Sequence, residues 1–109
     1  MAEHLHIREG HLNLLLNLLH EHLPGVEAWA YGSRVSGRSH DGSDLDLALR
    51  GTELDEIPFD QLATFNEAVR ESNIPFLIEA HDWTRIPARF HQEIERQHIP
   101  LNRKAYGQQ

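Results

Sequence analysis

The chain has no cysteine, so disulfide bonds, thiolate zinc sites and cysteine nucleophiles are excluded. Basic residues are scarce: 10 Lys and Arg stand against 17 Asp and Glu, which gives a formal net charge of −7. Because binding to a phosphate backbone relies on surfaces rich in Lys and Arg, we expect no direct nucleic-acid binding. No apolar run approaches the roughly 18 residues that cross a bilayer, and the first residues do not resemble a signal peptide. We therefore expect a cytoplasmic protein with no membrane partner.

The length of 109 residues leaves room for a single domain, residues 1–109. Hydrophobic periodicity predicts alternating helices and strands, with helices over 9–23, 60–71 and 87–97 and strands over 26–31, 43–50 and 75–81. This order predicts an α/β (α+β) fold, in which helices cover one face of a small β-sheet and leave the other face partly open. We expect the core to span about 12–100 and residues 101–109 to form a polar tail.

Two aspartates in the segment SDLDLALR carry the first chemical signal. Asp44 and Asp46 occupy alternate strand positions, so both side chains point to one face, roughly 6.6 Å apart along the backbone. Two such carboxylates repel each other, and strands disfavour Asp, so a compensating divalent cation is expected. Mg²⁺ takes one or two acids together with substrate phosphates, and a pair of ions can be bridged from these positions. The alternative is a solvated strand face with ordinary surface acids, which a bare D-x-D alone would favour.

The segment upstream of this pair adds a phosphate-binding signal. Gly32 and Ser33 lie where the first predicted strand ends. Glycine lets backbone N–H groups approach a ligand closely, and a serine hydroxyl with adjacent N–H groups can hold phosphate oxygens. A phosphate cradle and an acid pair are thus separated by one short loop, and a nucleoside triphosphate with its metal needs both. The predicted phosphate-binding set is Gly32, Ser33, Arg34, Arg38 and Ser43.

The segment GSRVSGRSHDGSDLDLAL resembles the signature of the polymerase-β-like nucleotidyltransferase superfamily. That signature is G-S, ten residues, then D-x-D, and here Gly32-Ser33, Asp44 and Asp46 match it. The length and the order of elements resemble in particular the minimal nucleotidyltransferases, which are single-domain bacterial and archaeal proteins. The resemblance runs from about Leu12 to about Pro100, and it implies the polymerase-β-like palm, a small mixed β-sheet covered by helices.

This resemblance implies a reaction and a partner. Asp44 and Asp46 would bind Mg²⁺, with two ions expected, and Gly32 and Ser33 would hold the triphosphate of ATP. A hydroxyl would attack the α-phosphorus, and pyrophosphate would leave. Certain minimal nucleotidyltransferases are antitoxins that transfer AMP to a tyrosine of a HEPN-domain ribonuclease partner. The resemblance therefore implies a protein adenylyltransferase in a hetero-oligomer with a HEPN-domain toxin.

Two positions depart from the family pattern. The third carboxylate of the family is usually Asp, whereas the matching residue in FLIEAHDW is Glu79, which completes the predicted catalytic and metal-binding set of Asp44, Asp46 and Glu79. Asp82 is the other candidate for the third acid, but a regular strand would point it to the opposite face. Ser36 stands where relatives commonly carry a basic residue.

These departures leave alternatives open. One is a non-catalytic antitoxin or binding module that neutralises the HEPN partner by complex formation. Another is transfer onto the hydroxyl of a small molecule, although the chain has no room for an additional substrate-binding domain.

Several aromatic residues lie close to these motifs. Trp29 and Tyr31 share one side of the first predicted strand, where core packing is the favoured interpretation and stacking on adenine is the alternative. Trp83 is expected to pack against the last helix. His81 lies beside the candidate acid Glu79, where it would tune that carboxylate or contact nucleotide, or else simply end the strand as a polar residue.

Overall fold

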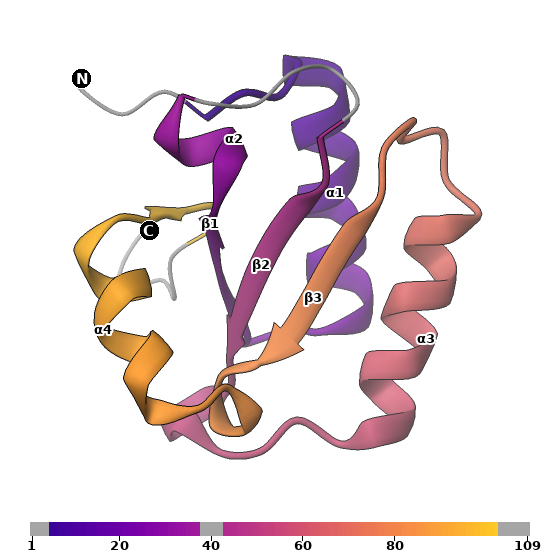
Figure 1. Cartoon of the computed structure of the whole chain (residues 1–109). Helices are drawn as coiled ribbons and strands as arrows, with labels where there is room; N and C mark the ends of the chain where they lie inside the picture. Colours follow the sequence, from indigo (N-terminus) through magenta and orange to yellow (C-terminus); the bar gives the residue numbers. More distant parts are fainter. Residues whose placement is uncertain (1–4, 38–42, 103–109) are drawn as a thin grey trace.

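A computed structural model describes residues 5–37 and 43–102, so the predicted phosphate ligand Arg38 lies outside the described residues. All six predicted elements are found, with three short helical segments and a short last strand added (Figure 1). In chain order the elements are α1 (Glu9–His22), β1 (Glu27–Tyr31), α2 (Ser33–Ser36), β2 (Leu45–Arg50), η1 (Thr52–Leu54), α3 (Phe59–Arg70), β3 (Ile78–Asp82), η2 (Trp83–Arg85), α4 (Ala88–Arg96) and β4 (Ile99–Pro100).

The strands form one mixed sheet in the order β3-β2-β1-β4. The central strand β1 pairs antiparallel with both β2 and β4, whereas β2 and β3 are parallel. A parallel pair requires a crossover connection, and α3 is the helix that provides it between β2 and β3. The predicted α+β fold with a small mixed sheet is therefore confirmed.

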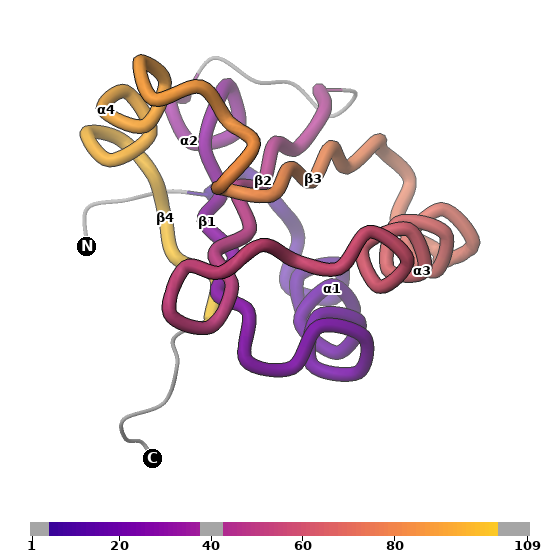
Figure 2. Tube along the Cα trace, turned by 90° about the horizontal axis from the view of Figure 1, so that it is seen from below, coloured from indigo at the N-terminus to yellow at the C-terminus, as the bar shows by residue number. Residues whose placement is uncertain are grey.

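The main core lies between the sheet and the helices α1 and α3, which lie on the same face of it (Figure 2). Alternate residues of the two central strands point toward these helices, and Ala30 of β1 and Leu47 of β2 have no exposed surface. Leu15 of α1 and Phe65 of α3 meet them and are equally buried. The period-two alternation read from the sequence thus assigns the inner face correctly.

Although the sequence predicts helices on one face only, the opposite face of the sheet is partly covered by α4 (Figure 2). Ala48 of β2, Trp83 and Ile94 of α4 form a second, smaller buried cluster on this face. Trp83 stacks on the ring of His91 with centroids 3.7 Å apart, which confirms that it packs against the last helix. The helix covers only one end of this face, and the remainder, around Asp46, is left for the candidate site.

The segment assigned to the tail is also partly structured. The N–H of Leu101 donates to the carbonyl of Ala28 at 2.8 Å. The Asn102 amide pairs with β1 at both atoms: its oxygen accepts from the N–H of Ala28 at 2.8 Å, and its nitrogen donates to the carbonyl of Val26 at 2.9 Å. Side-chain amides that imitate a backbone partner are not visible in hydrophobic periodicity, so the sequence places the end of the sheet too early. In the described part of the chain, no helix has the length and apolar character to cross a bilayer.

Candidate active site

The turn between β1 and α2 has a backbone conformation that requires glycine. Gly32 has φ 88° and ψ −154°, a region that is essentially restricted to glycine. A Cβ atom at this position would lie 2.6 Å from Oδ2 of Asp46, well inside van der Waals contact. The predicted phosphate-binding turn and the predicted acid pair, which are separate in the sequence, are therefore in direct contact.

Two of the three predicted acids lie on neighbouring strands, and the third directly precedes one of these strands. Asp46 of β2 is the register partner of Glu79 of β3, and Asp44 lies two positions before Asp46, just ahead of the start of β2. Burial raises the pKa of the Asp46 carboxyl above its ordinary value, and the negative charges of Glu79 and Asp44 raise it further, while His81 lowers it. The carboxylates are thus close enough to repel each other, and a bound cation would relieve that repulsion.

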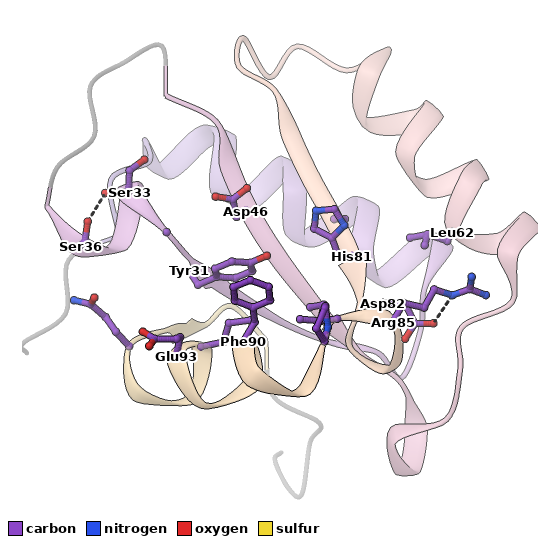
Figure 3. A pocket seen from close by; sticks show the side chains of 16 residues that line it. Tyr31, Ser33, Ser36, Asp46, Leu62, His81, Asp82, Arg85, Phe90 and Glu93 are labelled. Carbon is purple, nitrogen blue, oxygen red and sulfur yellow. Dashed lines mark hydrogen bonds and ion pairs between the residues drawn. The ribbon is translucent and has the colours of Figure 1, made fainter.

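Tyr31 adds a phenol to this group of acids. It is the last residue of β1 and the register partner of Asp46 (Figure 3). Burial raises the pKa of the Tyr31 hydroxyl, and the charges of Asp46 and Glu79 raise it further. The hydroxyl therefore stays protonated near neutral pH and can act as a hydrogen-bond donor.

His81 and Glu79 are both exposed and lie on the same face of β3, with Nε2 of His81 3.9 Å from Oε1 of Glu79. This agrees with the expected proximity of the two side chains. An ion pair at this distance forms only when the imidazole is protonated, so the pair is best described as a contact that can orient Glu79.

A cavity of about 730 Å³ opens beside these residues, within the size range of small-molecule sites. Gly32, Ser33 and Asp46 line one end of it, and Tyr31 contributes to its lining on the sheet side (Figure 3). The opposite wall comes from α4 and the residues before it, including Phe90, Glu93 and Gln97. Sequence reasoning missed this wall, because no local pattern shows on which face of the sheet α4 packs.

The structure corrects the role predicted for Arg34. Its side chain is 2% exposed and does not line the cavity. The guanidinium donates to the carbonyls of Ser43 at 2.9 Å and of His6 at 2.6 Å, and it lies 3.9 Å above the ring of Phe76. Arg34 thus ties the residues before α1 to the start of β2, and we remove it from the phosphate-binding set. Ser43 likewise lies beside Arg34 and is not among the residues that line the cavity.

Asp82, the alternative third acid, is occupied elsewhere. It is 1% exposed, and its Oδ2 accepts a hydrogen bond from the N–H of Ile57 at 2.8 Å. Its Oδ1 accepts from both the N–H and the hydroxyl of Thr84 at 2.9 Å. This carboxylate fixes two connecting segments. Asp82 lines the cavity and Glu79 does not, but both Asp82 oxygens are engaged in these hydrogen bonds, so Glu79, the register partner of Asp46, stays the candidate third acid.

The carboxylates fit a Mg²⁺ site that is completed by substrate. Within residues 5–37 and 43–102, no three His, Asp or Glu side chains are already gathered closely enough to hold a metal ion. Mg²⁺, however, is usually bound through one or two carboxylates plus substrate phosphates rather than by a complete protein cage. Of the three acids only Asp46 lines the cavity; Asp44 and Glu79 are not among its lining residues, but they lie close enough for their charges to raise the pKa of Asp46. Asp46 thus offers one carboxylate at the cavity, and the two neighbouring acids can add oxygen donors to a bound ion.

A mixed sheet whose first strand ends in a Gly-Ser turn against Asp46, with a second Asp two positions before it, defines a polymerase-β-like nucleotidyltransferase palm. The fold agrees with a solved structure, "Crystal structure of the toxin-antitoxin with AMP-PNP", which matches with a TM-score of 0.68 at 20% identity over 90% of this chain and 74% of that one.

Sequence comparison narrows this class to a family, although no protein-family model matches the chain. A curated relative from Haemophilus influenzae, named "Probable protein adenylyltransferase MntA", is 32% identical over 102 residues, which cover 92% of this chain and 86% of the relative. The chain therefore belongs to the MntA family of minimal nucleotidyltransferases.

Proposed function

We propose that this protein is a Mg²⁺-dependent nucleotidyltransferase that transfers AMP from ATP to a tyrosine hydroxyl of a HEPN-domain toxin and so acts as its antitoxin. The observation that carries this proposal is the contact between the Gly32 turn and Asp46 at the end of a nucleotide-sized cavity. The name of the Haemophilus relative supports protein adenylylation, and the description of the structural neighbour supports a toxin–antitoxin setting and an ATP-like ligand.

Each group of the site has a separate task in this reaction. The turn at Gly32 and Ser33 would bind and orient the triphosphate, while Asp46 at the same cavity, with Asp44 two positions before it, would hold Mg²⁺. The metal supplies charge neutralisation along the phosphates. A bond forms between the acceptor oxygen and the α-phosphorus as the bond from that phosphorus to the pyrophosphate oxygen breaks. Glu79 lies on the strand beside Asp46, where its carboxylate can take up the acceptor proton or join the metal-binding set.

Intact-mass analysis tests this proposal directly. The protein is co-purified from its native host with its bound partner and incubated with ATP and Mg²⁺. Addition of whole AMP groups to the partner is expected, and it should disappear in the Asp46→Asn variant. The matched control is Asp60→Asn, which changes an exposed acid in the first turn of α3 in the same way. Transfer that is undiminished in Asp46→Asn would refute the assignment of Asp46.

A second candidate is an antitoxin that acts by occlusion alone. The observation in its favour is that the described residues hold no preformed three-ligand metal site, together with the longer Glu79 at the third acid position. In this case Asp44→Asn and Asp46→Asn would still neutralise the toxin in cells and no AMP would be added. Loss of neutralisation in both variants, with complex formation retained, would exclude it.

A further inference from the structure

Two aromatic side chains line the cavity from different elements. Tyr31 lies at the end of β1, and Phe90 lies on α4 (Figure 3). Phe90 remains 45% exposed, although exposing a large apolar ring to water is unfavourable. Such a ring beside a cavity is available to a ligand without any rearrangement of the core.

The rings elsewhere on this face of the sheet are paired. Trp29 stacks on His98 with centroids 3.8 Å apart, and Trp83 stacks on His91. Among the residues that the structure describes, neither Tyr31 nor Phe90 is in a ring–ring pair, and the recorded partner of the Phe90 ring is the Arg89 guanidinium, 4.8 Å from its centroid. The Phe90 ring is therefore left open for stacking, whereas Tyr31 also packs against the cluster of Ala48, Trp83 and Ile94 and offers the cavity only part of its surface.

The same cavity connects these rings to the phosphate-binding end. Gly32, Ser33 and Asp46 line it together with Tyr31 and Phe90. The α4 wall also carries the Glu93 carboxylate and the Gln97 amide, which can accept from and donate to the polar edge of a base. A ligand that fills the cavity thus needs a phosphate-rich end and a planar ring with a hydrogen-bonding edge, which is the chemistry of a nucleoside triphosphate.

We propose that Phe90, together with Tyr31, binds the nucleobase of the triphosphate substrate by stacking, which makes Phe90 a specificity-determining residue supplied by α4. This inference rests on the proposed nucleotidyltransferase function and extends it from the phosphates to the base. A planar ring could also come from an aromatic acceptor residue of the partner protein. Continuity with the Gly32 turn and with Asp46 favours the base, and the experiment separates the two sources.

The test measures binding of α,β-methylene ATP with Mg²⁺ to the full chain by titration calorimetry, in the absence of any partner. Phe90→Ala should raise Kd about 5- to 150-fold, since stacking contributes about 1–3 kcal/mol per base. The matched control is Phe59→Ala, which removes a ring that is 75% exposed on α3 and does not line the cavity. Phe59→Ala should leave Kd unchanged, and Phe90→Tyr should restore it. Tripolyphosphate, which has no base, should bind with Mg²⁺ equally to the unmodified chain and to the three variants.

Three results would overturn the inference. If Phe90→Ala binds the nucleotide normally but raises the KM for the protein acceptor, the part of the cavity beside Phe90 receives the aromatic ring of the acceptor residue. If Phe90→Ala weakens tripolyphosphate as much as nucleotide, the substitution distorts the whole cavity. Both results leave the proposed function standing. If the unmodified chain binds no nucleotide at all, the proposed function fails together with the inference.

Discussion

Replacing Gly32 by alanine tests the contact on which the whole site depends. The residue has φ 88° and ψ −154°, and a non-glycine residue in this region costs about 1–3 kcal/mol of folding free energy. The added Cβ would also lie 2.6 Å from Oδ2 of Asp46, so this carboxylate must move away from the turn. We expect Gly32→Ala to lower the free energy of unfolding by at least about 1–3 kcal/mol and to abolish AMP transfer. Because domains of this kind are stable by about 5–15 kcal/mol, most of the protein should still fold.

Two other glycines provide matched controls for this substitution. Gly37 has φ 89° and ψ 6°, and nothing lies within 4 Å of an added Cβ, so Gly37→Ala should cost only the backbone strain of about 1–2 kcal/mol. Gly10 lies in the first turn of α1 with no atom within 4 Å of an added Cβ, so Gly10→Ala should stabilise the protein by at most about 0.5–1 kcal/mol. Neither control should change AMP transfer.

Urea unfolding measures the free energy of unfolding of all three variants. An unchanged slope of this free energy against urea concentration is the evidence that the denatured state is the same. The AMP-transfer assay is then run without urea, at a temperature at which each variant is folded. The reasoning would be refuted if Gly32→Ala were as active as Gly37→Ala, because the Asp46 carboxylate would then not depend on the space that Gly32 leaves. Equal stability of Gly32→Ala and the unmodified protein would refute the backbone argument as well.

Three further predictions concern charged side chains. The raised pKa of Asp46 means that the folded state binds more protons than the unfolded state between the ordinary value of 3.8 and the folded value, so stability falls as pH rises through this window. Asp46→Asn should therefore raise Tm at pH 7, with the gain lost below the unfolded pKa, and equal melting curves at pH 7 would contradict this. Asp82→Ala should lower the free energy of unfolding by about 1–3 kcal/mol and also reduce transfer, because it loosens the anchor that keeps Glu79 opposite Asp46. Glu79→Gln should reduce transfer in the same assay and leave the free energy of unfolding unchanged. Arg34→Ala should lose about 1.5–3 kcal/mol in urea unfolding, and Arg34→Lys should not restore it, because a lysine lacks the planar fork that reaches two carbonyls; full rescue by lysine would count against this geometry.

The acid site was predictable because its geometry follows from strand periodicity. Asp44 and Asp46 alternate with buried leucines, so the side on which they point was fixed by the need to bury Leu45 and Leu47. The same alternation separates Glu79 from Asp82 on the next strand. These inferences needed only the alternation of side chains along a strand and one apolar face of the sheet.

The errors came from side chains whose environment is set by distant segments. Arg34 follows a phosphate-binding turn in sequence, which favoured a phosphate contact, but its guanidinium is buried by Phe76 and by the backbone of His6. Phe90 carried no local signal, because its exposure to the cavity depends on where α4 crosses the sheet. Both depend on long-range packing, which hydrophobic periodicity cannot supply.

The two carboxylates that competed for the role of third acid act together in the folded protein. Asp82 is the register partner of Leu49, and its hydrogen bonds to Ile57 and Thr84 anchor the end of β3. A shift of β3 by one residue would break these bonds and would turn every β3 side chain to the other face. Because the anchor holds the register, Glu79 stays opposite Asp46. The buried aspartate thus places the exposed glutamate at the site without taking part in the chemistry itself.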